Sequence, residues 1–404
     1  MADKSPIEWT DATWNPIVGC SIVSPGCTNC YAMKMAGRIE AMARGGERSE
    51  QGSKNPGAKH YAGTTKKVNG NTVWTGKLAL APEKTLLQPL AWRAPRRIFV
   101  NSMGDLFHED VPDEWIDRVF AVMALAPQHT FQVLTKRAKR MREYFAETWQ
   151  RPARAALEID GMTIPAQPVG VTDRWHQIDL AIDRVTEDTL FDDDRFWTPQ
   201  GSLIGRPAWP RQPLPNVWLG ISAERQQEAD ERIPDLLATP AAIRFVSAEP
   251  LLGPINFRRI RVAPDHHTII DALEGYAIAD AISGSGQERT MLDWIIAGGE
   301  SGHQARAMHP AWPRSIRDQC AAAGVSFFFK QWGEWRPSTP EQAKGNPRSG
   351  WRCLAAHPHV PKVDELYPEA GAEFVENMGK KAAGRMLDGV EHNAMPGPIE
   401  VPAL

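Results

Sequence analysis

Residues 97–136 have the sequence RIFVNSMGDLFHEDVPDEWIDRVFAVMALAPQHTFQVLTK. The runs at 97–101 and 130–134 are short and apolar, and they contain the β-branched and aromatic residues that buried strands prefer. Between them, residues 113–126 show the apolar spacing of a helix with one buried face. A strand, a helix and a second strand in this order predict a βαβ unit with parallel strands.

The same alternation continues along the chain. Further strands are predicted at 78–80, 216–221, 242–246, 293–297 and 325–329, and further helices at 82–92, 136–145, 224–237 and 312–323. This succession predicts an α/β fold with a complete or partial (β/α) barrel. A doubly wound open sheet is the alternative that periodicity leaves open.

Two stretches interrupt the alternation, at about 150–215 and 257–290, and we interpret both as insertions. Residues 1–335 are therefore predicted to form the barrel. Residues 336–404 are predicted to form a C-terminal extension that packs on it.

Length and composition exclude several classes of protein. The chain has 404 residues, of which 42% are hydrophobic and 24% charged, which excludes a disordered or fibrous protein. The net charge of −3 means that any contact with nucleic acid must use a local basic patch. No stretch approaches the ~18–20 consecutive apolar residues of a membrane span. The N-terminus lacks the apolar core of a signal peptide, so the chain is expected to be cytoplasmic and away from membranes.

Polar residues follow most of the predicted strands. They lie at 101–105, 135–136, 222–224, 247–250 and 298–301. Because the carboxyl ends of parallel strands open on one face of a barrel, these loops are expected to converge on one site. Ser, Asp and Gly are also common helix caps, so part of the pattern has a structural explanation.

Three of the five cysteines lie close together after a strand-like segment at 12–18. They are Cys20, Cys27 and Cys30. Structural zinc takes four protein ligands, whereas a [4Fe–4S] cluster held by three cysteines keeps one iron open for another ligand. The alternative is a zinc site completed by a distant ligand such as His60 or Cys353. Cys320, on a predicted helix, is interpreted as a small buried residue.

A three-cysteine loop after the first strand of a βα barrel resembles the radical S-adenosylmethionine (SAM) superfamily. Apart from the insertions, the chain resembles a phage and mobile-element family without an assigned function. Its members begin with a similar Trp-Asn-Pro…Gly-Cys…Ser-Pro-Gly-Cys-x2-Cys-Tyr, here at 14–31, and end with a similar Gly-Lys-Lys-Ala-Ala-Gly-Arg, here at 379–385. Residues 102–105 and 133–136 are also similar to spore photoproduct lyase, which repairs a DNA lesion. The first cysteine gap is six residues instead of the usual three.

The resemblance implies a [4Fe–4S] cluster bound by the three cysteines, with SAM as the second cofactor. We expect Asp105 or Glu224 to bind the SAM ammonium group, and Lys136 its carboxylate, with Ser222 in support. Tyr31 stands one position after the last cysteine, whereas the aromatic residue that packs on adenine usually precedes that cysteine. No residue is assigned as catalytic.

The substrate prediction comes from basic residues that alternate with tryptophans, as at 91–97 and 330–336. This pattern suits a phosphate backbone and a stacked base, so DNA or RNA modification or lesion repair is the expected activity. Glu249 and Glu300 are expected to face the substrate. The alternative is a phage-related, non-catalytic protein that binds zinc or a cluster and acts as an interaction module with a partner protein.

The segment after residue 135 carries several positive charges. Lys136 follows a predicted strand directly, so we expect its ammonium group at the mouth of the barrel. Arg137, Lys139 and Arg140 belong to the helix predicted next and are expected to point to solvent.

Overall fold

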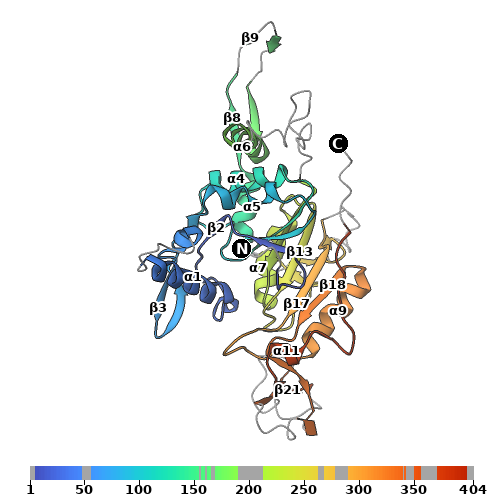
Figure 1. Ribbon diagram of the computed structural model, residues 1–404. Coiled ribbons are helices and arrows are strands. Elements are labelled where there is room, and N and C mark those ends of the chain that lie inside the picture. The colour runs from blue at the N-terminus through green and yellow to red at the C-terminus, as the bar shows by residue number, and fades with distance from the viewer. Residues whose placement is uncertain are drawn as a thin grey trace.

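The computed structural model describes residues 5–47, 56–153, 156–159, 162–164, 169–189, 213–262, 268–277, 290–339, 341–342, 350–355 and 371–397. A parallel sheet of seven strands forms its centre (Figure 1). In sheet order the strands are β1 (Ala12–Trp14), β6 (Arg97–Val100), β7 (Thr130–Thr135), β12 (Val217–Ser222), β13 (Ile243–Ala248), β17 (Trp294–Gly298) and β18 (Ser326–Gln331). The βαβ unit predicted from residues 97–136 is therefore confirmed.

The strands have the same order in the sheet as along the chain. Leu219 of β12, for example, lies opposite Val133 of β7 on one side and Arg244 of β13 on the other. Each connection thus advances one strand in the same direction, as in a (β/α) barrel, whereas a doubly wound sheet reverses its order at a switch point. β1 and β18 are the edges of this curled sheet, so the described strands form a partial barrel.

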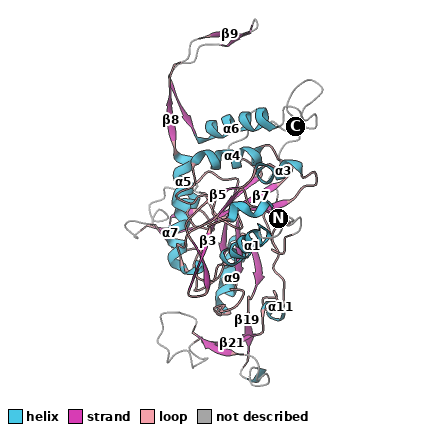
Figure 2. Ribbon diagram, turned by 60° about the vertical axis from the view of Figure 1, so that its left-hand side comes forward, coloured by secondary structure: helices cyan, strands magenta, loops and turns pink. Residues whose placement is uncertain are grey.

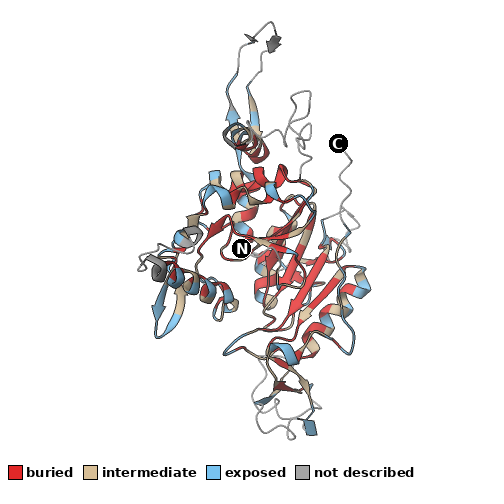
Figure 3. Ribbon diagram, in the orientation of Figure 1, coloured by how far each residue is buried: buried red, intermediate tan, exposed pale blue. Residues whose placement is uncertain are grey.

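Helices cover the outer face of the sheet. They are α4 (Asp113–Ala124), α5 (Ala138–Ala146), α7 (Gln226–Leu237) and α9 (Ala311–Ala323). Their apolar faces, with Val119, Met141, Ile233 and Ile316 fully buried, join outward side chains of the strands in one large core (Figure 3). Burial of this kind is the main stabilising contribution to such a layered fold.

The inner face of the sheet changes character along the strands. Its amino half carries an aromatic layer formed by Trp9, Phe99, Trp218, Phe245, Trp294 and Phe328. Because side chains on one face recur every second residue, Gly220 and Ser222 of β12 follow Trp218 on this face, and Ser247 follows Phe245. On β12 and β13 the carboxyl half of the inner face therefore carries small and mostly polar residues.

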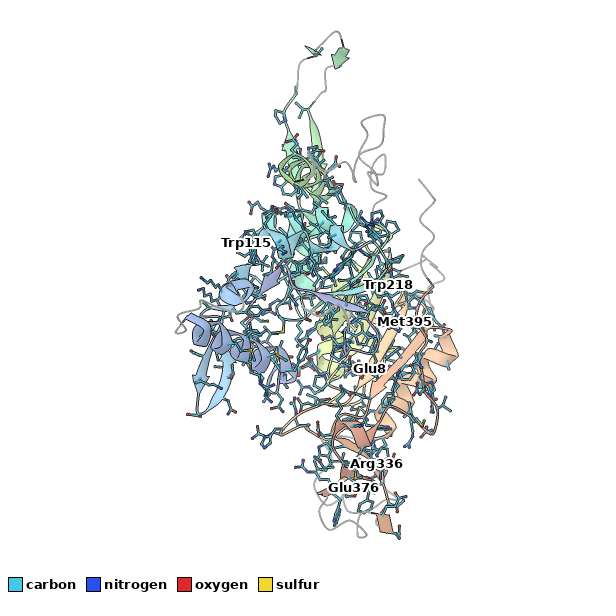
Figure 4. All side chains as sticks on the ribbon, viewed as in Figure 1. Glu8, Trp115, Trp218, Arg336, Glu376 and Met395 are labelled. Atoms are coloured by element: carbon cyan, nitrogen blue, oxygen red, sulfur yellow. The ribbon has the colours of Figure 1, made fainter. Side chains whose placement is uncertain are left out.

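Residues 392–395, here called the C-terminal strap, cover the aromatic layer. Phe329 N–H donates to the carbonyl of His392 (2.9 Å), and Asn393 forms a β-bridge with Phe328. The indole N–H of Trp294 donates to the carbonyl of Ala394 (2.9 Å). Met395 packs against the same cluster as Trp218, and both residues are labelled in Figure 4.

The first strand is shorter than the strand-like segment at 12–18. β1 ends at Trp14, and β2 (Ile17–Val18) pairs instead with β5 (Ala79–Leu80) in a small antiparallel sheet. Pro16 has no N–H to donate and interrupts the segment between the two strands. The strand predicted at 78–80 is therefore β5 and lies outside the central sheet.

The chain between β1 and β6 forms an N-terminal region of short elements. It contains η1 (Pro25–Cys27), α1 (Tyr31–Glu47), η2 (Pro56–Tyr61), β3 (Thr65–Val68), β4 (Asn71–Trp74), α2 (Glu83–Leu86) and α3 (Gln88–Ala91). The helix predicted at 82–92 is thus two short helices, and Pro89 stands near the start of the second. Among the described residues, no helix has the length and apolar character needed to cross a membrane.

The predicted insertion at 150–215 begins with a hairpin arm. Its strands β8 (Thr148–Arg151) and β11 (Gly170–Asp173) pair antiparallel, and β9 (Leu157–Ile159) and β10 (Met162–Ile164) pair near its tip (Figure 2). The following helix α6 (Arg174–Thr189) packs on α4. Residues 190–212 of this insertion lie outside the described residues.

The other two additions are small antiparallel sheets. The insertion at 257–290 forms β14 (Ile260–Arg261), β15 (Ile269–Asp271) and β16 (Tyr276–Ala277). The C-terminal extension forms β19 (Trp335–Ser338), β20 (Trp351–Leu354) and β21 (Glu373–Asn377), followed by α11 (Lys380–Ala383).

Candidate functional site

The candidate site is the carboxyl edge of the central sheet, where the three-cysteine loop meets the residues that follow the strands. These residues are Asn15 after β1, Asp105 in the loop after β6, Lys136 and Arg137 after β7, Glu224 after β12, Glu249 after β13 and Glu300 after β17. Hydrogen bonds connect the loop to several of these strand ends, as the parallel arrangement predicts.

The three-cysteine loop runs from Gly19 to Cys30. Gly19 has a positive φ of 96°, its N–H donates to the carbonyl of Met103 (3.2 Å), and a Cβ at this position would lie 2.1 Å from the carbonyl oxygen of Lys77. Only glycine fits such a position. Cys27 ends the short helix η1, and Cys30 N–H donates to its carbonyl (3.3 Å). The loop is thereby fixed to the end of β6 and turned back on itself.

Arg137 connects this loop to the sheet. Its guanidinium donates to Asp105 (2.9 Å) and Glu109 (2.9 Å), and it reaches Ser21 Oγ (2.7 Å). It also lies 3.6 Å from the sulfur of Cys20. Burial alone would lower the pKa of Arg137, but the neighbouring carboxylates outweigh it and raise the pKa. Arg137 is 5% exposed, so the expectation that it points to solvent is wrong.

The reason for that error is the helix start. α5 begins at Ala138, so Arg137 belongs to the turn between β7 and α5 and points inward. Lys139 does point outward, with a side chain that is 73% exposed. Arg140 is partly exposed (22%) and forms an ion pair with Asp113.

Asp105 is the centre of the hydrogen bonding at this edge. Besides Arg137, its carboxylate accepts from Thr135 Oγ1 (2.6 Å) and from the backbone N–H groups of Phe107 and Lys136 (3.1 Å each). A carboxylate has about four acceptor positions, so these contacts use all of them. The binding of a SAM ammonium group by Asp105 stays a prediction, and it would require an exchange of one of these partners.

Glu224 links the loop to β7 and β12. Its side chain is fully buried, pairs with Lys136 and lies 3.3 Å from Arg232. It also accepts from Ser24 Oγ in the cysteine loop (3.0 Å). Burial by itself would raise the pKa of Glu224, but the two cations and the hydrogen bonds reverse this effect and lower the pKa. A Cβ on Gly26 would lie 2.2 Å from the Glu224 carboxylate, so the loop is packed directly on it.

Glu300 forms a second link to the loop. Asn29, between Cys27 and Cys30, donates to its carboxylate (3.0 Å), and the guanidinium of Arg306 pairs with it (2.6 Å). Burial would raise the pKa of Glu300, but the bonds from Arg306 and Asn29 lower it. Asn29 occupies the position before the last cysteine and thus has a defined structural role.

The remaining predicted residues have different surroundings. The hydroxyl of Tyr31, at the start of α1, donates to the carbonyl of Ser102 (3.0 Å), and the residue is 56% exposed. Ser222 is buried at the end of β12. Glu249 pairs with Lys330 (3.0 Å) and accepts from Ser247 (3.1 Å) in the polar half of the inner face. The structure thus brings Lys136 and Glu224 into contact and leaves Tyr31 at the surface.

Two of the three thiols, those of Cys20 and Cys30, share one environment. Cys20 and Cys30 both pack against the apolar cluster around Met33, Tyr61 and Met103. Burial raises the pKa of Cys20 to about 12, with a smaller effect from Asp105, and it also raises the pKa of Cys30. In the part of the chain that the structure describes, no three His, Cys, Asp or Glu side chains are already arranged to hold a metal ion.

The other candidate ligands lie on separate elements. His60 belongs to η2, where its ring packs on Tyr61 (4.6 Å between ring centres). Cys353 lies in β20, opposite Phe374 of the C-terminal sheet, and Cys320 is buried on α9. The interpretation of Cys320 as a small buried residue is confirmed.

Several residues of this site were not found from the sequence. Arg137, Ser24, Asn29 and Arg232 each bind a strand end or the cysteine loop. Asn15 also takes part, since its side-chain oxygen accepts from Met103 N–H (2.9 Å). Only Asn29 had a signal, because it stands between two of the cysteines. Ser24, Asn15 and Arg137 make contacts over 88 to 200 residues of sequence. Arg232 contacts Ser222 and Glu224, which lie only 10 and 8 residues before it on the other side of a turn.

A comparison with protein families finds one match. The family is described as "Protein of unknown function (DUF5131)", and its model covers residues 4–396. No curated protein and no solved structure matches the chain.

Proposed function

The chain belongs to this family of unknown function over almost its whole length, and on that premise we propose that it is a radical SAM enzyme that acts on nucleic acid. Cys20, Cys27 and Cys30 would hold a [4Fe–4S] cluster. When bound, such a cluster with SAM supplies one-electron reductive cleavage and a 5′-deoxyadenosyl radical. The activity would be nucleic-acid modification or lesion repair.

One observation carries the proposal. The three-cysteine loop follows the first strand of a partial (β/α) barrel and lies on the carboxyl edge of its sheet, in contact with residues after β6, β7, β12 and β17. In barrels of this kind the chemistry takes place at that edge.

The donor set is suited to iron. Three thiol groups on a single short loop are soft ligands of the kind that iron–sulfur clusters take, and three of them leave one iron open. Cys30 lies near enough to Cys20 to contribute to the raised pKa of Cys20, and Cys27 lies near enough to Cys30 to contribute to the raised pKa of Cys30. Cluster binding would require the side chains to turn toward a common centre, because they are not arranged around one in the described structure.

The protein's own residues would bind and orient the second cofactor. Lys136 has a side chain that is 20% exposed and pairs with Glu224, and its ammonium group would bind the SAM carboxylate. Glu249 and Lys330 lie further along the polar inner face and would contact the substrate. The aromatic layer lies below them and is buried, so the amino half of the inner face offers no polar surface to the substrate.

The substrate class is supported by basic residues that pair with aromatic rings. The guanidinium of Arg96 lies 4.8 Å from the ring centre of Trp92, and that of Arg352 lies 4.8 Å from Trp335. Both rings are buried (9% and 7% exposed), so they hold guanidinium groups that suit a phosphate backbone but do not themselves offer a stacking surface. The alternative function is a non-catalytic metal-binding protein that acts as an interaction module, and the arrangement of Cys20 and Cys30 beside a buried apolar cluster also suits that role.

Anaerobic reconstitution separates the two functions. The protein would be incubated with iron and sulfide, analysed for iron, sulfide and zinc, then reduced with dithionite in the presence of SAM. About four irons per chain, together with release of 5′-deoxyadenosine, support the enzyme. Stoichiometric zinc without iron supports the interaction module. Cluster formation without SAM cleavage would overturn the proposed radical activity.

A further inference from the structure

The C-terminal part of the chain contains a cavity of about 560 Å³. Its lining includes Arg314, Trp332, Arg336, Gly384, Arg385 and Met386. A volume of this order is typical of sites for small ligands. None of the cysteines lines the cavity, and the proposed function leaves it without a role.

The second half of the motif at 379–385, residues 382–385, lines one wall of the cavity. Trp332 fixes it on both sides of Arg385, because its backbone N–H donates to the carbonyl of Gly384 (3.1 Å) and its indole N–H donates to the carbonyl of Met386 (2.8 Å). Gly384 has a φ of 73° and a ψ of −164°, a conformation open almost only to glycine. A Cβ there would meet no atom within 4 Å. The motif therefore builds a fixed, open backbone wall.

Two arginines of the lining have donors without acceptors. The Nε atoms of Arg336 and Arg385 are buried and have no hydrogen-bond partner among the described residues. Arg336 comes from β19 and forms a long ion pair with Glu376 (3.9 Å), next to which it lies in Figure 4. Arg385 packs its guanidinium on the ring of Phe328 (5.4 Å) and lies 3.7 Å from Glu391. Both side chains keep exposed area, 41% for Arg336 and 29% for Arg385.

The three lining arginines all have carboxylate partners, but the pairs differ in length. Arg314 is closely paired with both Glu373 (3.0 Å) and Asp388 (2.8 Å). Arg336 and Arg385 have longer pairs, 3.9 Å to Glu376 and 3.7 Å to Glu391, and Arg385 also donates to the side chain of Asn393. A bound anion would give these two weakly paired guanidinium groups closer acceptors.

We propose that this cavity is a binding site for a phosphate group, held by Arg336 and Arg385. Guanidinium groups present paired donors that match the oxygens of a phosphate, and two of them from different elements can surround one. The phosphate could come from a nucleic-acid backbone or from a free nucleotide, since both offer the same chemistry. The inference stands apart from the proposed function, because no residue of the cysteine loop contributes to the cavity.

The test measures binding by the full chain as purified, without reconstitution of a cluster. The probes are a fluorescein-labelled single-stranded oligothymidine, AMP and inorganic phosphate. Arg336→Gln and Arg385→Gln each remove one charge from the cavity, and Arg118→Gln on α4 is the matched control with a single surface ion pair to Glu83. Thermal unfolding of each variant checks that it is folded.

At least one probe is expected to bind, and Arg336→Gln and Arg385→Gln are each expected to weaken it by about tenfold or more, the effect of one charge-assisted hydrogen bond. For the oligonucleotide, each variant should also release about one ion fewer on binding, which is measured as a shallower slope of log K against log salt concentration. Arg118→Gln should bind as the wild type does. Binding of the oligonucleotide alone identifies a nucleic-acid backbone, and displacement of it by AMP identifies a nucleotide. No binding of any probe, or equal binding by folded Arg336→Gln, Arg385→Gln and Arg118→Gln, would overturn the proposal. SAM cleavage is independent of either result.

Discussion

Replacement of Arg137 by Met should destabilise the protein more than replacement of any neighbouring cation. Its guanidinium is almost fully buried and bonds to Asp105, which is also buried (7% side-chain exposure). Arg137→Met keeps much of the side-chain volume but leaves the Asp105 carboxylate without its counter-charge. The hydrogen bonds that Asp105 accepts from Thr135 and Lys136 remain.

The expected magnitude follows from the partners that are lost. Removal of one member of a buried ion pair costs about 3–5 kcal/mol, mostly because the other charge stays buried and unpaired. The second pair, with Glu109, adds little, because that carboxylate is 59% exposed. Ser21 keeps a hydrogen bond with His108 (2.9 Å), so the loss of its hydrogen bond to Arg137 is partly compensated. With an unfolding entropy of about 2.1 cal/mol/K per residue, the loss equals a decrease in Tm of about 4–6 °C for a chain of this length.

The assay is thermal unfolding at pH 7, followed by tryptophan fluorescence, with Lys139→Met as the control. Lys139 is two residues away and 73% exposed, so its loss should change the free energy of unfolding by no more than about 0.5 kcal/mol. The double variant Arg137→Met with Asp105→Asn should be less destabilised than the sum of the single variants, because it leaves no buried charge unpaired. Equal Tm values for Arg137→Met and Lys139→Met would refute the buried position of Arg137.

Three further outcomes are expected. Cys27→Ala should abolish retention of iron after reconstitution, whereas Cys353→Ala, in the C-terminal sheet, should retain it; full iron content in the Cys27 variant would exclude this loop as the cluster site. Lys136→Ala should weaken SAM binding by about 1.5–3 kcal/mol in isothermal titration, whereas Lys139→Ala should not, and the reverse order would place the SAM site elsewhere. Glu300→Gln should reduce the free energy of unfolding at pH 7 by more than at acid pH. The pKa of Glu300 is lowered in the folded protein, so its stabilising effect is present above the ordinary glutamate pKa of about 4.3 and is lost as the pH falls through the lowered value. The measurement is urea unfolding of both proteins over a range of pH. A difference in the free energy of unfolding that does not change with pH would contradict this prediction.

The strands and helices of the barrel were largely predictable because burial imposes a period on the sequence. The strands predicted at 216–221 and 242–246 are β12 and β13 to within two residues. The helix predicted at 312–323 is α9 with one added residue. The segment at 78–80 has the same apolar character, but periodicity does not say which partner a strand will pair with, and β5 pairs with β2.

The candidate site was predictable only in part. Lys136 and Glu224 each follow a predicted parallel strand, which predicted that both lie at one edge of the sheet. In the structure they form an ion pair. The inward turn of Arg137 depends on a helix start that lies two residues later than predicted, and a boundary of this kind is not fixed by apolar spacing. The contact of Ser24 with Glu224 joins residues 200 positions apart, for which no local pattern exists.

The C-terminal strap has a consequence for the way in which the chain is made. Residues 392–395 cover the aromatic layer, yet they are synthesised after all seven strands of the central sheet. A nascent chain that has released β18 but not the strap would therefore expose the rings of Trp294 and Phe328 to water. Exposed aromatic surface of this kind promotes aggregation and recruits chaperones. We expect the last step of folding to follow release of the strap from the ribosome. A chain that ends before residue 392 would therefore expose an aromatic surface that the full chain covers.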